Sequence, residues 1–141
     1  PMAADVQMGA LISEKHLGRV LDYVEAGRSE GATIATGGNR VRPQGFENGY
    51  FMEPTILTDC TDNMRVVREE IFGPVMSVLT FSTEDEAITR ANDTKFGLGA
   101  GLMTKDLARA HRVAGQLESG NVWVNTKLER IHSTPRTANS S

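Results

Sequence analysis

The chain has 141 residues, of which 39% are hydrophobic, and a formal net charge of -3. This length accommodates one domain with an ordinary core, so we expect a single folded unit. The basic residues are spread along the chain without a cluster, which argues against nucleic acid or an anionic membrane as a partner. Cys60 is the only cysteine, which excludes an internal disulfide and suits a reducing compartment.

No apolar run approaches the roughly 18 residues that a membrane-spanning helix requires. The first ten residues also lack the charged and apolar regions of a secretory signal. We therefore expect a cytoplasmic protein.

The N-terminal third predicts one amphipathic helix. Four apolar residues between Leu17 and Val24 recur at helical spacing. Ser13 is a suitable N-cap and Gly31 a suitable stop signal, so the helix is expected to occupy residues 13–30.

Short extended segments follow this helix. We expect a strand over residues 32–36, a surface loop over 40–50 and a further extended segment over 50–57. Pro54 favours an edge position for the last of these, since proline cannot donate to a strand ladder. One helical turn is expected within residues 61–68.

The second half alternates strands with helices. The expected elements are, in chain order, a strand over 75–81, a helix that starts at Ser82 and Thr83, a strand over 98–104, a helix over 105–117 and a strand over 121–125. Thr83 and Glu86 stand at capping-box spacing, and the apolar composition of residues 75–81 is typical of a strand buried on both faces. This alternation predicts an α/β fold with a mostly parallel sheet and flanking helices.

Residues 127–141 depart from this pattern. They are rich in Ser, Thr, Arg and Asn and show no sustained apolar period. We interpret them as a disordered or loosely attached tail that follows a domain over residues 1–126.

The stretch REEIFGPV, residues 68–75, is the best candidate for a site. Glu69 and Glu70 are adjacent carboxylates, and Phe72 follows them directly before a Gly-Pro bend. From these residues alone two interpretations are open. The carboxylates cap or solvate the start of a strand while Phe72 joins the core, or the stretch binds a ligand.

Several collinear segments of the chain together resemble the aldehyde dehydrogenase superfamily, and most closely its betaine-aldehyde and amino-aldehyde members. The resemblance covers about 120 residues, from the M-G-x-L-I-S start at Met8 to the S-G-x-V-x-V-N strand that ends at Asn125. Between them lie G-x-F-x-x-P-T-I-L at 49–57, E-E-x-F-G-P-V at 69–75 and the A-N-x-T-x-F-G-L block at 91–98.

The resemblance implies the fold and cofactor site of that family. It identifies the chain with the C-terminal part of the family's catalytic domain, in truncated form. It also implies that Glu70 reaches the hydroxyls of the nicotinamide ribose and that Phe72 lies against the nicotinamide of NAD or NADP. A carboxylate can accept two hydrogen bonds from a vicinal diol, and a planar ring restricts where the nicotinamide can rest.

No catalytic residue of the family is expected in this sequence. The family's nucleophilic cysteine, glutamate base and oxyanion-binding asparagine lie upstream of the matched segment. Cys60 stands beside Asp59 and Asp62, whose charges disfavour a thiolate, so we interpret it as a structural or incidental cysteine. After Asn125 the family's P-F-G-G-x-K-x-S-G segment is also absent.

Other candidate chemistry is sparse. The three histidines, at positions 16, 111 and 132, lack metal-ligand spacing, and we interpret His16 and His111 as helix-surface residues. The glycines at 97, 99 and 101 lie within an expected strand, where they allow close packing and do not form a phosphate loop.

We therefore expect a chain related to an NAD(P)-dependent aldehyde dehydrogenase that is inactive alone. Two alternatives stay open. One is a non-catalytic interaction module that forms a homodimer or pairs with a full-length relative, and the other is a weak nucleotide binder.

Overall fold

The first helix, α1 (Glu14–Ser29), begins and ends where the sequence predicts. Ser13 accepts a hydrogen bond from the backbone N–H of His16, which satisfies one free donor of the first turn. Gly31 follows the helix with a φ of 108°, a conformation that residues with a side chain rarely adopt. The structure, a computed structural model, describes residues 6 and 8–126.

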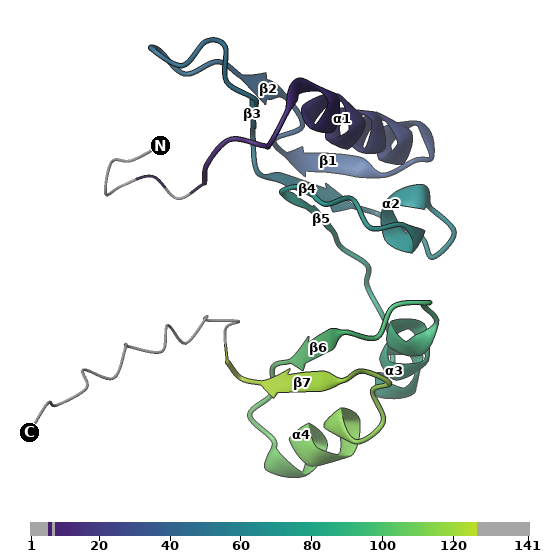
Figure 1. Ribbon diagram of the computed structural model, residues 1–141. Coiled ribbons are helices and arrows are strands. Elements are labelled where there is room, and N and C mark those ends of the chain that lie inside the picture. The colour runs from purple at the N-terminus through teal and green to yellow at the C-terminus, as the bar shows by residue number, and fades with distance from the viewer. Residues whose placement is uncertain (1–5, 7, 127–141) are drawn as a thin grey trace, which may run out of the picture. The chain divides into compact units, whose positions relative to one another are not determined.

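A three-stranded sheet accompanies α1. β1 (Thr33–Thr36) pairs antiparallel with β4 (Thr55–Thr58), and β4 pairs parallel with β5 (Val75–Ser77), so β4 is the central strand. Figure 1 shows α1 running alongside β1. The predicted strand over 32–36 is confirmed.

Residues 40–58 were expected to form a loop followed by one extended segment. They contain three short strands instead. β2 (Arg40–Val41) pairs antiparallel with β3 (Phe51–Met52), and β4 follows. Pro54 lies between β3 and β4, outside both ladders, and β4 is central. The predicted edge position was therefore wrong, because the chain interrupts its strand at the proline.

The core of this part of the chain lies between α1, the sheet and α2 (Arg65–Arg68), the predicted helical turn. Gly27 shows how closely they pack, since a Cβ there would stand 3.0 Å from Val66 Cγ1 and 3.1 Å from Leu57 Cδ1. The buried core residues are Leu17, Val20, Tyr23, Val24, Ala32, Met52, Leu57, Cys60, Met64, Val66 and Ile71.

β5 is shorter and less buried than predicted. It covers three residues instead of 75–81, and Met76 within it is 54% exposed. Among the described residues β5 pairs with β4 alone, so it is an edge strand of this sheet. The expectation of burial on both faces was wrong.

The chain divides into two compact units, Pro1–Phe81 and Ser82–Ser141, where one folded unit was expected. The second unit contains α3 (Glu84–Asn92), β6 (Gly99–Leu102), α4 (Leu107–Ala114) and β7 (Asn121–Val124). β6 and β7 form a parallel pair, and α4 is the crossover that packs against both strands. This is the strand–helix–strand arrangement that the sequence predicts.

The start of α3 confirms the expected capping residues. Thr83 Oγ1 accepts a hydrogen bond from the backbone N–H of Glu86. The Glu86 carboxylate accepts one from the N–H of Ser82, and this bond is the main cause that lowers the pKa of Glu86.

The α/β class is thus confirmed, with small sheets in place of one large sheet. The pairs β4–β5 and β6–β7 are parallel, whereas β1–β4 and β2–β3 are antiparallel. The predicted tail over 127–141 lies outside the described residues. No helix in the described part of the chain is long and apolar enough to cross a membrane.

Candidate functional site

The candidate stretch forms a bend between α2 and β5, which we call the elbow (residues 69–74). It begins with extended backbone, since Glu69 has φ and ψ of -115° and 151°. Phe72 then takes a left-handed conformation with a φ of 55°. The carbonyl of Pro74 accepts a 2.8 Å hydrogen bond from Thr55 N–H, which joins the elbow to the parallel β4–β5 ladder.

Glu69 is bound into the fold of the first unit. Its Oε2 accepts a 2.6 Å hydrogen bond from the hydroxyl of Tyr23, a core residue of α1. Arg65 Nε lies 3.2 Å from Glu69 Oε1, and the Arg65 guanidinium also lies over the Tyr23 ring, 4.6 Å from its centroid. The hydrogen bond and the charge of Glu69 raise the pKa of Arg65 above its usual range.

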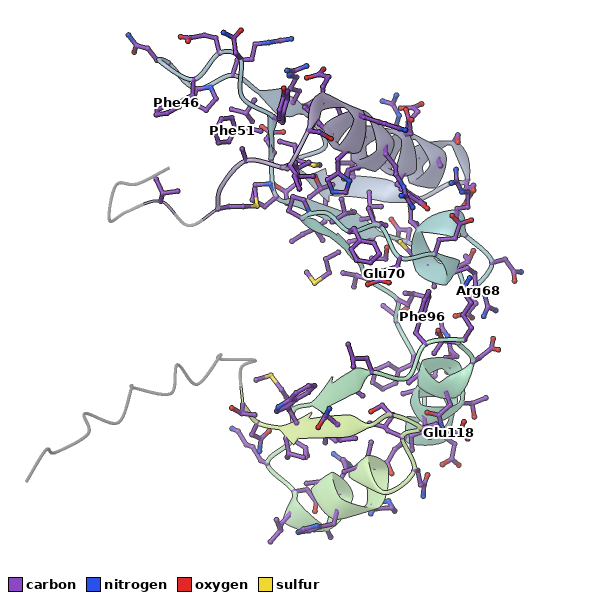
Figure 2. The ribbon with its side chains drawn as sticks, viewed as in Figure 1. Phe46, Phe51, Arg68, Glu70, Phe96 and Glu118 are labelled. Carbon is purple, nitrogen blue, oxygen red and sulfur yellow. The ribbon has the colours of Figure 1, made fainter. Side chains whose placement is uncertain are left out.

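Glu70 differs from Glu69 in its contacts, although both residues are exposed and both line the same side of the elbow. Glu70 is exposed, and within residues 8–126 its side chain makes no hydrogen bond or ion pair. Figure 2 labels it beside the elbow. The pair of carboxylates is therefore divided into one structural and one available member.

Phe72 is exposed as well, contrary to the interpretation that it joins the core. Its relative exposure is 67%. A left-handed conformation is rare for a bulky residue and requires contacts that hold it. One such contact is visible, because the carbonyl of Phe72 lies 2.7 Å from His16 Nε2 on α1.

Gly73 lets the elbow pass directly over α1. A Cβ at this position would stand 2.6 Å from Cγ1 and 2.8 Å from Cγ2 of Val20, closer than real side chains approach. Val20 is fully buried, so it has no room to move away. The glycine of the motif is thus required by packing.

The elbow borders an open depression of about 490 Å³. Ligand sites commonly have volumes of about 300–1,000 Å³. Glu70 and Phe72, the two predicted site residues, both line it. The other lining residues are Val66, Val67, Glu69, Ile71, Gly73, Val75, Ser77 and Leu79.

This arrangement suits a ligand that has a diol next to a planar ring. Glu70 supplies a carboxylate that can accept hydrogen bonds from hydroxyls, and Phe72 supplies an aromatic surface. The described residues that line the depression supply carboxylates, one hydroxyl, an aromatic ring and aliphatic groups, which can bind and orient such a ligand.

Three residues that hold the elbow in place were not identified from the sequence. His16 is half-buried, and its ring contacts the elbow, a contact that the interpretation as a helix-surface residue did not include. Tyr23 and Arg65 hold Glu69. For His16 and Tyr23 the sequence does contain a signal. Residues 16, 20 and 23 are spaced i, i+4 and i+7, so they share the inner face of the predicted helix.

Cys60 is buried, as a structural cysteine should be. Its relative exposure is 8%, and its Sγ lies 3.6 Å from the carbonyl of Leu57. It does not line the depression beside the elbow.

The prediction that glycines 97, 99 and 101 lie within a strand and allow close packing is confirmed for Gly99, whereas Gly97 lies outside β6 and a Cβ on Gly101 would meet no atom closer than 3.8 Å. A Cβ on Gly99 would stand 2.6 Å from the ring of Trp123, which covers this glycine from the neighbouring strand β7. His111 is exposed on α4. Among the described residues no three His, Cys, Asp or Glu side chains are grouped so that they could hold a metal ion.

Comparison with known proteins supports the resemblance. Residues 1–137 match the aldehyde dehydrogenase family. The betaine aldehyde dehydrogenases of Brucella anthropi and Brucella ovis are 58% and 54% identical over 125 residues, which are 89% of this chain and 26% of each relative.

Solved structures agree with these matches. The betaine aldehyde dehydrogenase of Staphylococcus aureus in complex with NAD+ matches with a TM-score of 0.86 and 44% identity over 91% of this chain and 25% of its own. An NAD+ complex of an aldehyde dehydrogenase from Bacillus cereus matches with a TM-score of 0.84 and 47% identity over 92% of this chain and 26% of its own. The chain thus spans about a quarter of the length of these relatives, and it belongs to the aldehyde dehydrogenase family.

Proposed function

We propose that the elbow forms the nicotinamide-ribose end of a dinucleotide site in an NAD- or NADP-dependent enzyme that oxidises aldehydes to carboxylic acids. In this role the Glu70 carboxylate accepts hydrogen bonds from the ribose hydroxyls, and the Phe72 ring limits the movement of the nicotinamide. The cofactor would supply the hydride acceptor of the reaction. The observation that carries the proposal is the difference in contacts between two exposed carboxylates, since Glu69 is bound to Tyr23 and Arg65 while Glu70 is held by neither and lines the depression together with Phe72.

Two solved structures of relatives also support this proposal. The structures from Staphylococcus aureus and Bacillus cereus are complexes with NAD+, and each shares the fold of this chain over more than nine-tenths of its length. A cytoplasmic location is part of the same proposal and is supported by the single, buried cysteine.

We further propose that the 141-residue chain does not oxidise aldehydes by itself. The reaction needs a thiolate that attacks the aldehyde and a base that assists. Cys60 is the only thiol of the sequence, and its sulfur is buried against the Leu57 carbonyl. The residues at the elbow bind and orient, and turnover requires groups that this chain does not contain.

Calorimetric titration of the chain with NAD+ tests the binding role. We expect saturable binding that Glu70→Gln weakens at least several-fold, because a neutral amide is a poorer acceptor for a diol than a carboxylate. Glu118→Gln is the matched control, since Glu118 is another exposed carboxylate, in the second unit, and loses the same charge (Figure 2). Equal weakening by both variants, or no binding by the parent chain, would contradict the proposal.

A second function, self-association or pairing with a full-length relative, is favoured by exposed apolar side chains. In the second unit Leu98, Met103 and Leu107 are 86%, 79% and 72% exposed. Apolar groups that gather at a surface mark association sites. Light scattering should give the mass of a dimer or a larger assembly, and Leu107→Gln should shift it toward the monomer. A monomer at all concentrations would exclude self-association.

A further inference from the structure

One stripe of α1 makes three contacts with the elbow. His16, Val20 and Tyr23 are spaced i, i+4 and i+7, which places them on one face of the helix. Tyr23 donates to Glu69 at the start of the elbow, and Val20 occupies the space above Gly73 near its end. His16 lies next to Phe72 between these two contacts.

The contact of His16 with Phe72 determines which ring nitrogen of His16 carries the hydrogen. A carbonyl oxygen can only accept, so His16 Nε2, at 2.7 Å, must be the donor. The ring therefore has its hydrogen on Nε2 in this arrangement. The backbone of His16 is held as well, because its N–H donates to the side chain of Ser13 at the start of α1.

Phe72 depends on this contact more than a buried residue would. Its side chain is 67% exposed, so few neighbours restrict the ring directly. The direction of the ring is instead set by the backbone, whose φ of 55° a bulky residue adopts only when its surroundings impose it. A change in this φ would swing the ring away from the depression that it lines.

We propose that His16 is a positioning residue of the site: by donating from Nε2 to the Phe72 carbonyl it holds the left-handed backbone and so aims the phenyl ring at the nicotinamide. This inference rests on the proposed function of Glu70 and Phe72. His16 itself touches no ligand.

Nuclear magnetic resonance of the whole chain tests the positioning role without any ligand. Long-range proton–nitrogen spectra should show His16 protonated on Nε2, and scalar couplings should show a positive φ at Phe72. His16→Leu should abolish the positive φ, and His16→Gln, whose amide N–H reaches to a similar distance, should restore it. His111→Leu removes an exposed histidine of α4 and should leave Phe72 unchanged. A Phe72 backbone that is the same in His16→Leu and in the parent chain, or His16 protonated only on Nδ1, would overturn the inference.

Titration of the same variants with NAD+ separates the two proposals. We expect His16→Leu to weaken binding about five-fold, the effect of one ordinary hydrogen bond, and His16→Gln to restore most of it. Absence of binding by the parent chain would refute the proposed function, while the Phe72 couplings would still decide whether His16 holds the elbow. Unchanged affinity in a His16→Leu chain whose Phe72 backbone has changed would refute the positioning role alone.

Discussion

The hydroxyl of Tyr23 on α1 donates a 2.6 Å hydrogen bond to the carboxylate of Glu69, 46 residues later in the chain. This contact fixes the start of the elbow on the helix that also provides much of the core. It distinguishes Glu69 from its neighbour Glu70, whose side chain is not held by Tyr23. The contribution of this hydrogen bond to the free energy of unfolding can be measured directly.

Tyr23→Phe should destabilise the first unit by about 1 kcal/mol, the usual net contribution of one hydrogen bond. The phenyl ring keeps the packing, and Arg65 still holds Glu69. Tyr50→Phe is the matched control, because the Tyr50 hydroxyl makes no hydrogen bond among the described residues. Urea unfolding followed by circular dichroism checks both, and equal effects of the two variants would contradict the role of the Tyr23 hydroxyl.

Alanine substitutions at two glycines near α1 should have opposite effects. Gly73→Ala places a methyl group 2.6 Å from Val20 Cγ1 and should destabilise the chain by about 1–3 kcal/mol through overpacking. Gly18→Ala, within α1 and with no atom near its new methyl, should stabilise it by about 0.5–1 kcal/mol. Thermal unfolding midpoints measure both, and a neutral Gly73→Ala would show that the elbow is not packed closely on α1.

The second unit should lose stability in acid through Glu84. This residue starts α3 and binds Arg109 and Arg112 of α4, and the hydrogen bond from Arg112 is the largest cause that lowers the pKa of Glu84 below its usual value of 4.5. A depressed folded pKa means that the carboxylate contributes its stability above about pH 4.5 and loses it as the pH falls through the folded pKa.

Unfolding midpoints measured from pH 7 to about pH 3 should therefore fall less steeply in Glu84→Gln than in the parent chain. Glu118→Gln provides a control because Glu118 is an exposed carboxylate of the same unit and loses the same charge. An identical pH profile for Glu84→Gln and the parent chain would show that Glu84 does not contribute to the loss of stability in acid.

Asn125 should stabilise the end of β7. Its side chain accepts from Thr104 N–H and donates to the Thr104 carbonyl, at 2.8 and 2.7 Å, and its φ is 53°. Asn125→Ala loses both bonds and also meets the steric cost of a left-handed alanine, so we expect a loss of about 2 kcal/mol. Asn125→Gly should lose less, because glycine tolerates this φ. Trp123 fluorescence during unfolding reports on the neighbouring strand, and an equal loss in both variants would show that backbone strain plays no part.

Local signals in the sequence predicted the helices well. Ser13 and Thr83 cap α1 and α3 as expected because capping depends on residues within one turn. α4 begins at Leu107 and not at Lys105, since Asp106 serves as its N-cap. The strands were less predictable, and β5 was expected to be longer and more buried because apolar composition does not reveal which neighbours a strand will have.

The candidate site was predictable only in part. Glu70 and Phe72, which the resemblance singles out, both line the depression, and their role toward a cofactor stays a prediction. Nothing within the motif indicates that Glu69 is bound by Tyr23, or that His16 holds Phe72, because both partners lie on a helix more than forty residues earlier. Contacts of this kind depend on the pairing of distant segments, which a single sequence does not specify.

The stripe of α1 has a consequence for how temperature acts on the site. The elbow depends on α1 at three points, through His16, Val20 and Tyr23, besides its contacts with Arg65 of α2 and with the Thr55 N–H of β4. If the elbow binds a dinucleotide as we propose, fraying of α1 from its first turn would release Phe72 and lower binding at temperatures below the melting temperature. A bound dinucleotide would oppose that early loosening and raise the temperature at which it begins.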